Sequence, residues 1–164
     1  MRIAMALITI SLAGCFGDVN DLGSNGPDAR MVDVKAILGE WSGCMTMTNF
    51  QTANMMQAWS TLASNDGKAC QGCHSNAQFG FMATDDEGAF FTGISQHSAL
   101  MAMYFTVDLA TEKVIVNKQS FASANSAIGH PRFNTTMNAG MTALETFYAA
   151  TLSNSLCGTA RMID

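Results

Sequence analysis

Two cysteines and a histidine within one short segment carry the clearest chemical signal in the sequence. Residues 70–74 read Cys-Gln-Gly-Cys-His. This spacing is the attachment signature of c-type haem, because two thiols three residues apart on one helical turn can reach the two vinyl groups along one porphyrin edge. The histidine follows on the same turn, where its imidazole can ligate the iron. We therefore predict that Cys70 and Cys73 bind one haem c covalently and that His74 is an axial ligand.

Zinc binding and dithiol chemistry are the alternatives for this segment. A structural zinc site needs two further ligands, and the sequence has no second Cys-x-x-Cys and no His-x-x-x-His pair. A thioredoxin-like redox pair belongs in a βαβ context, which the flanking residues do not show. Haem attachment is therefore the favoured interpretation.

The first residues predict export. Met1-Arg2 is a short positive start, an apolar run follows over residues 3–12, and the next residues complete Leu12-Ala13-Gly14-Cys15. A charged tip, a short apolar stretch and small residues before a cleavage site describe a secretory signal; a buried segment with a chance cysteine is the alternative. The tetrapeptide resembles the lipobox of bacterial lipoproteins, which implies that residues 1–14 are removed as a signal peptide and that Cys15 carries lipid.

The segment after this cysteine has the composition of a linker. Residues 17–30 are rich in glycine, aspartate and asparagine and nearly free of large apolar side chains. We therefore predict a lipidated N-terminus and flexible tether over residues 15–40, with an ordered loop as the alternative. Phe16 stands where many lipoproteins retained in the inner membrane carry aspartate, which favours the outer membrane. The predicted location is the bacterial cell envelope, lipid-anchored, with the domain periplasmic or surface-exposed.

Charge and hydropathy restrict the possible partners. The chain has 164 residues, a formal net charge of −5 and only 13% charged residues. An acidic balance without a basic patch argues against nucleic acid as a partner. No apolar run reaches the roughly 18 residues that a membrane-spanning helix needs. Contact with a membrane is therefore predicted through the lipid anchor.

Two amphipathic segments are predicted to form the helices that position the motif. Residues 49–64 place three large apolar side chains on one helical face just before it. Residues 138–152 carry a second apolar stripe near the end of the chain. The first face consists of Met55, Trp59 and Leu62, and the second stripe consists of Met141, Leu144, Tyr148 and Leu152.

The residues between the motif and the last helix predict smaller elements. Apolar residues alternate with polar ones over 105–109, residues 111–113 intervene, and a second strand-like segment follows over 114–116, which together predict a small β-hairpin. Residues 122–125 and the small residues after them predict a loop. The acidic run at residues 85–87 predicts a solvated turn, with a docking patch for a basic redox partner as the alternative.

The haem motif, the lipobox and this arrangement of helices resemble an exported monohaem c-type cytochrome. Specific sequence matching is confined to the five-residue motif. The resemblance implies a mainly α, cytochrome c-like helical domain around one covalent haem over residues 41–164, with the β-hairpin as an insertion. It also implies that the last helix packs across the helix before the motif, with Phe147 and Tyr148 meeting Trp59 or a neighbour.

The same resemblance places the second axial ligand in the loop before the last helix. His130 is the first choice, because Pro131 holds it in an extended conformation and stiffens the loop. Met137 and Met141 are the alternatives, since thioether ligation is the commoner arrangement in such cytochromes. His97 and an open coordination position remain further possibilities.

Two cysteines are left after lipid and haem attachment. Cys44 and Cys157 stand near the two helices whose crossing the resemblance implies, so they are a possible disulfide. Export permits the bond, provided that the two Cα atoms lie within about 7 Å. Two free buried thiols are the alternative.

Electron transfer is the function that these features favour. A covalent haem cycling between Fe(II) and Fe(III) needs axial ligands, a pocket and redox partner proteins, and no residue need act as an acid or a base. The chain is therefore predicted to be a carrier rather than an enzyme. The alternatives are a haem enzyme or a gas or peroxide sensor with an open distal site, and a non-redox lipoprotein that binds zinc.

Overall fold

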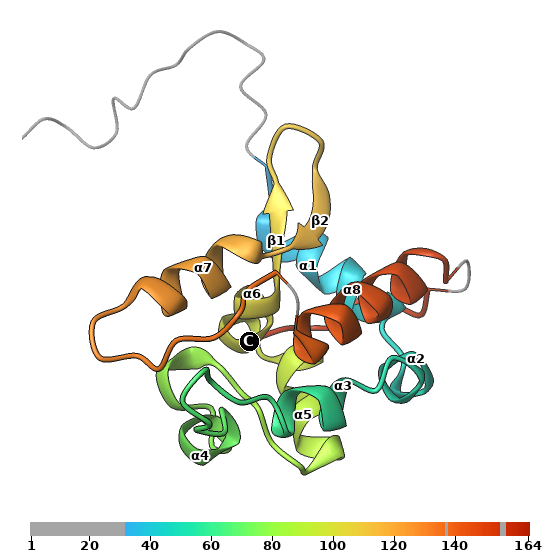
Figure 1. Ribbon diagram of the computed structural model, residues 1–164. Helices are drawn as coiled ribbons and strands as arrows, with labels where there is room; N and C mark the ends of the chain where they lie inside the picture. Colours follow the sequence, from blue (N-terminus) through green and yellow to red (C-terminus); the bar gives the residue numbers. More distant parts are fainter. Residues whose placement is uncertain (1–31, 137, 155–156) are drawn as a thin grey trace, which may run out of the picture. The chain divides into compact units, whose positions relative to one another are not determined.

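The computed structural model describes residues 32–136, 138–154 and 157–164. Within them the chain is mainly helical, with a two-stranded antiparallel sheet (Figure 1). The prediction of a mainly α fold with a small β-hairpin is thereby confirmed. The elements in chain order are α1 (Val34–Cys44), α2 (Met47–Thr52), α3 (Met55–Ser60), α4 (Gln71–His74), η1 (Gln78–Gly80), α5 (Glu87–Gln96), α6 (Ser98–Tyr104), β1 (Phe105–Asp108), β2 (Lys113–Val116), α7 (Lys118–Ser126) and α8 (Ala139–Leu152).

Polar residues fix where most of the longer helices begin. In each case a side-chain oxygen accepts a hydrogen bond from a backbone N–H of the first turn, which otherwise has no partner inside the helix. The caps are Asp33 for α1, Thr46 for α2, Asp86 for α5, Asn117 for α7 and Asn138 for α8. The acidic run at residues 85–87 therefore contains a helix cap and the first residue of α5.

The helix predicted over residues 49–64 is two short helices. Asn54 has a left-handed backbone with φ of 57° and separates α2 from α3. The apolar face is nevertheless correct, since Met55, Trp59 and Leu62 are all buried. Breaking the helix turns α2 so that Phe50 also enters the core, where its ring lies 5.7 Å from that of Phe147.

Helix α8 crosses α3 at a point of very close approach. A Cβ atom added to Gly140 would lie 2.9 Å from the indole of Trp59, so only glycine fits there. The predicted helix over residues 138–152 is confirmed, as is its packing on the helix before the motif. Its predicted stripe is wrong at one position, because Leu152 is exposed and Phe147 is buried instead.

Helices α1 and α7 occupy segments that were predicted to be tether and loop. Helix α1 begins at Val34 and ends at Cys44, so the helical domain includes residues placed in the tether over residues 15–40. Helix α7 contains residues 122–125, which were predicted to be a loop, and Phe121 buries its single large apolar side chain. Residues 1–31, and with them the predicted signal peptide and Cys15, lie outside the described residues.

The hairpin agrees with its prediction. Strands β1 and β2 pair in antiparallel register, with Phe105 opposite Val116 and Asp108 opposite Lys113. In Figure 1 the hairpin and α4 lie at opposite ends of the unit formed by residues 32–164. None of the helices in the described ranges is long and apolar enough to cross a membrane.

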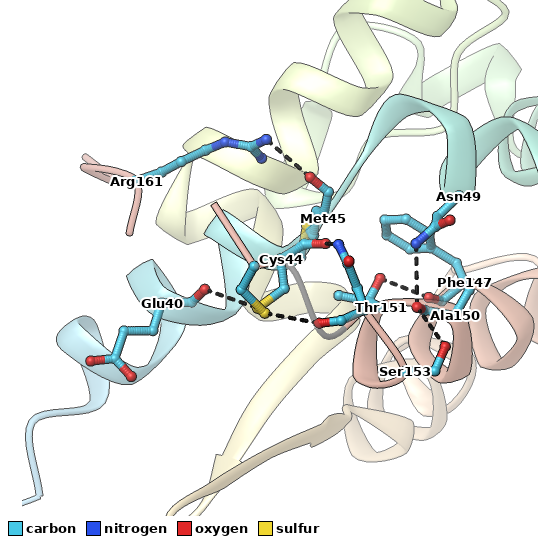
Figure 2. Close-up of a disulfide and its surroundings, with 11 residues drawn as sticks. Glu40, Cys44, Met45, Asn49, Phe147, Ala150, Thr151, Ser153 and Arg161 are labelled. Atoms are coloured by element: carbon cyan, nitrogen blue, oxygen red, sulfur yellow. Dashed lines mark hydrogen bonds between the residues drawn. A yellow bond between two sulfur atoms is a disulfide. The ribbon is translucent and has the colours of Figure 1, made fainter. Parts of the chain in front are cut away.

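Cys44 and Cys157 form a disulfide between the end of α1 and the segment after α8, with Cα atoms 4.1 Å apart (Figure 2). This confirms the pairing that the resemblance implied. The surrounding backbone is joined as well, since the Asn154 amide donates to the carbonyl of Cys44 at 2.9 Å and the Arg161 guanidinium donates to that of Met45 at 3.0 Å.

The segment after the disulfide lies against a glycine face of α1. The N–H groups of Gly158 and Arg161 donate to the carbonyls of Gly43 and Gly39, each at 3.0 Å. A Cβ on Gly43 would lie 2.7 Å from the carbonyl oxygen of Thr159. We call residues 157–164 the C-terminal strap. The strap can lie this close to α1 only because residues 39 and 43 of that helix are glycines.

Replacing Gly43 by alanine is expected to lower the free energy of unfolding by about 1–3 kcal/mol, because a backbone carbonyl blocks the new methyl group. The measurement is chemical denaturation of the purified protein. Gly88→Ala is the matched control, since a Cβ there makes an ordinary contact of 3.6 Å with Asp86. An equal effect of the two substitutions would contradict close packing of the strap on α1.

Candidate functional site

The motif folds as a single helical turn. Cys70 stands at the start of α4, and its carbonyl accepts hydrogen bonds from the N–H groups of Cys73 and His74 at 3.2 and 3.0 Å. Both motif cysteines are free thiols, Cys70 half-buried and Cys73 exposed. The turn predicted from the spacing is thus present, and both thiols remain available for attachment.

Backbone pairing fixes this turn to the rest of the domain. The Cys70 N–H donates to the carbonyl of Leu62 at 2.8 Å, and a short bridge joins Ala63 to Ala69. After the turn, the Ala83 N–H donates to the carbonyl of His74 at 3.0 Å. The motif is therefore attached to the chain that enters it from α3 and to the chain that leaves it toward α5.

The imidazole of His74 is oriented by a backbone carbonyl. Its Nδ1 lies 2.9 Å from the carbonyl oxygen of Gln78, which can only accept, so the ring proton is on Nδ1. The second nitrogen, Nε2, then carries the lone pair that a metal needs. The ring also contacts Phe81, with centroids 5.0 Å apart. His74 thus has the tautomer of a metal ligand.

The ring of His130 lies near that of His74. The two ring centroids are 6.2 Å apart, and the ring planes make an angle of 40°. Two imidazoles on opposite sides of one metal ion have centroids about 6 Å apart, because each metal–nitrogen bond is about 2 Å and each ring centre lies about 1 Å behind its nitrogen. The observed separation therefore fits a metal ion between the two rings.

The Nδ1 atom of His130 is buried and has no hydrogen-bond partner among the described residues. A buried polar atom without a partner carries a free-energy cost. At this nitrogen the ring of His130 therefore has no hydrogen bond to fix its orientation, in contrast to the ring of His74.

The loop that carries His130 is positioned by residues that the sequence analysis did not single out. The Phe133 N–H donates to the side-chain oxygen of Asn125 in α7 at 2.9 Å. The Asn65 N–H donates to the carbonyl of Arg132 at 2.6 Å, which joins this loop to the one before the motif. Neither asparagine has a local sequence signal, because each acts on a residue distant in the chain.

Exposed apolar side chains flank the histidine pair. Phe79 is 88% exposed, with its ring centroid 6.3 Å from that of His74, and Ile128, two residues before His130, is fully exposed. A Cβ on Gly72, inside the motif, would meet no atom within 4 Å. Large apolar side chains beside open backbone fit contact with a flat apolar group such as a porphyrin.

Burial affects two titratable groups near the motif. It raises the pKa of the Cys70 thiol, and the charge of Cys73 adds to this effect. It also raises the pKa of Tyr104 well above its ordinary value, and the Tyr104 hydroxyl donates to the carbonyl of Met82. Both groups are therefore protonated at neutral pH.

The other candidates for the second ligand differ in their surroundings. Met141 is buried in the hydrophobic core on α8, and Met137 lies outside the described residues. His97 pairs with Asp164 of the C-terminal strap, with Nδ1 2.6 Å from a carboxylate oxygen. Of the two candidate histidines, His97 and His130, only His130 has a ring contact with His74.

The zinc alternative lacks ligands in the described part of the chain. No group of three or more His, Cys, Asp or Glu side chains there could hold a metal ion. A structural zinc site needs four ligands. The arrangement around Cys70 and Cys73 therefore does not favour zinc.

Comparisons with known proteins identify no family. The sequence matches no family model, and no match is found among curated proteins or solved structures. The structure defines a mainly helical domain with a disulfide, in which a second histidine lies near a Cys-x-x-Cys-His turn.

Proposed function

We propose that the protein is an electron carrier with one covalently bound haem c. Cys70 and Cys73 form the thioether bonds, and His74 and His130 are the axial ligands. The observation that carries the proposal is the pair of imidazoles with ring centroids 6.2 Å apart, beside two free thiols on one helical turn. When bound, the haem supplies one-electron chemistry by cycling between Fe(II) and Fe(III).

The residues of the chain have distinct roles in this proposal. The thiols fix one porphyrin edge, and the Gln78 carbonyl holds the His74 ring in its ligating tautomer. Buried Phe81 and Tyr104 exclude water from the inner side of the site. Exposure of Cys73 places the attached edge near the protein surface, which favours electron exchange with a partner protein at that edge.

The proposal includes a location in the bacterial cell envelope. We propose that Cys15 carries lipid and that the anchor favours the outer membrane, with redox partner proteins reached by diffusion along the membrane surface. The disulfide between Cys44 and Cys157 supports an oxidising compartment, because such bonds persist outside the cytoplasm. Bacterial attachment of haem to c-type cytochromes takes place outside the cytoplasm as well.

Haem staining of a denaturing gel tests the cofactor directly, because covalent haem survives denaturation. In cells competent for c-type maturation the wild-type protein is expected to stain, and the Cys70→Ala/Cys73→Ala variant is expected not to stain. Cys44→Ala/Cys157→Ala is the control, because it removes the same number of thiols outside the site and should still stain. An unstained wild-type band would contradict the proposal and would leave zinc as the alternative.

A further inference from the structure

The two histidines of the proposed site are held unequally, and His74 is the more firmly fixed. It ends α4 next to a cysteine of the motif. Its N–H donates to Cys70, its carbonyl accepts from Ala83, and its Nδ1 is bonded to the carbonyl of Gln78. Backbone and ring are therefore both fixed before any cofactor contributes.

His130 has fewer restraints. Its N–H donates to the carbonyl of Ala127 over 3.3 Å, and its buried Nδ1 has no partner in the described ranges. The residue before it, Gly129, has φ of +79°, which a residue with a side chain rarely adopts. The side chain of Ile128, one residue earlier, is fully exposed. The turn that presents His130 is therefore a surface turn packed against little on its outer side.

This difference affects the strength of the two bonds to iron. A histidine whose second nitrogen donates to a carbonyl is held in orientation and is a more basic ligand than one without such a partner. His74 has this partner, and His130 lacks it. The bond from His130 to the iron is therefore the weaker of the two.

We infer that His130 is an exchangeable ligand and that a neutral diatomic gas molecule replaces it on the reduced iron. The inference rests on the haem site proposed above and adds a ligand-binding function to it. With carbon monoxide as the probe, the iron–nitrogen bond to His130 breaks and an iron–carbon bond forms. No electron is transferred, and the imidazole leaves in its neutral form.

The structure also indicates what controls this exchange. Downstream of His130, the Phe133 N–H is bonded to Asn125 and the Arg132 carbonyl to the Asn65 N–H. These bonds fix the loop after His130, so we expect His130 to move through the turn around Gly129 that precedes it. Asn125 is a positioning residue, because loss of its acceptor oxygen would free the loop on the side nearest α7.

Carbon monoxide binding to the reduced, haem-loaded protein tests the inference by absorption spectroscopy after rapid mixing. Wild-type protein is expected to bind with a rate that levels off at high gas concentration, because departure of His130 becomes limiting. His130→Ala is expected to bind faster, with a rate that rises in proportion to gas concentration. Asn125→Leu should raise the limiting rate about tenfold, the effect of losing one hydrogen bond of ordinary strength.

Two further variants separate positioning from a general loss of stability. Asn125→Asp keeps the acceptor oxygen and is expected to retain the wild-type limiting rate. Gln119→Ala changes an exposed side chain on the same helix, bonded to Ser123, and should leave the rate unchanged. Equal limiting rates for the Leu and Asp variants at position 125 would contradict the role of Asn125.

The possible failures are distinguishable. If wild-type protein binds no carbon monoxide and His130→Ala binds it, His130 is a fixed ligand and the inference is wrong, while the electron carrier stands. If both bind it equally fast, His130 is not a ligand, which overturns the inference and the ligand assignment together. Absence of covalent haem would overturn the proposed function itself.

Discussion

Replacing His130 by alanine is expected to convert the oxidised protein from a low-spin to a high-spin haem spectrum. Two imidazoles on opposite sides of the iron keep it low-spin, and the facing rings at 6.2 Å are placed for that arrangement. The measurement is the visible absorption spectrum of oxidised and reduced protein. Wild-type protein should also lack the long-wavelength band that is typical of thioether ligation.

Substitution by methionine sharpens this test. His130→Met should restore a low-spin spectrum and raise the reduction potential by on the order of 0.1 V, because thioether ligation favours the reduced iron. Met137→Ala and Met141→Leu are the controls, since each removes an alternative thioether ligand. Loss of the low-spin spectrum in either control, with His130→Ala unchanged, would contradict His130 as the ligand.

Removal of the disulfide is expected to have the largest effect on stability. The bond joins residues 113 positions apart, and closing a loop of about 100 residues in the unfolded chain is worth about 4–5 kcal/mol. Cys44→Ala/Cys157→Ala should lower the free energy of unfolding by about this amount, measured by denaturation of the haem-loaded protein. The spectrum of its native state should stay that of the wild type.

A reducing agent provides the matched control for the disulfide. It should lower the denaturation midpoint of wild-type protein and leave that of the double variant unchanged. Thioether bonds are not reduced under these conditions, so the haem stays attached in both. A loss of stability below about 1 kcal/mol would show that this bond constrains the unfolded chain far less than its loop length implies.

Features with a local cause were predictable from the sequence. The motif forms the expected turn because its spacing follows one helical repeat, and α8 was found because Met141, Leu144 and Tyr148 recur at helical intervals. The hairpin was found because apolar residues alternate with polar ones along β1 and a second strand-like segment follows at β2. In each case the pattern that predicts the element lies within a few neighbouring residues.

Features with a tertiary cause were missed. Helix α1 contains Gly39 and Gly43, which weaken a helical pattern, and both are explained by the strap that packs on them. Helix α7 is mostly small and polar, and Phe121 alone is buried, so no stripe was visible. The break at Asn54 follows from the need to bury Phe50 as well as Met55.

In the candidate site, too, some residues were predictable from local sequence and others depend on tertiary contacts. Pro131 drew attention to His130, and the structure places the ring of that histidine 6.2 Å from the ring of His74; its role as a ligand stays a prediction. The residues that hold its loop, Asn65 and Asn125, were not predictable, because their partners are distant in sequence. Local sequence patterns identified the candidate ligands. They did not identify the hydrogen bonds that hold the loop of His130 in place.

The disulfide also has a consequence for the timing of assembly. In an oxidising compartment the thiols nearest in sequence react first, because closing a short loop costs less entropy than closing a long one. Cys70 and Cys73 would therefore join each other before Cys157, made late in synthesis, met its partner 113 residues away. Under the proposed function, haem attachment must therefore outpace oxidation of Cys70 and Cys73, and a delay in attachment would divert the chain to a product in which these two cysteines are paired with each other.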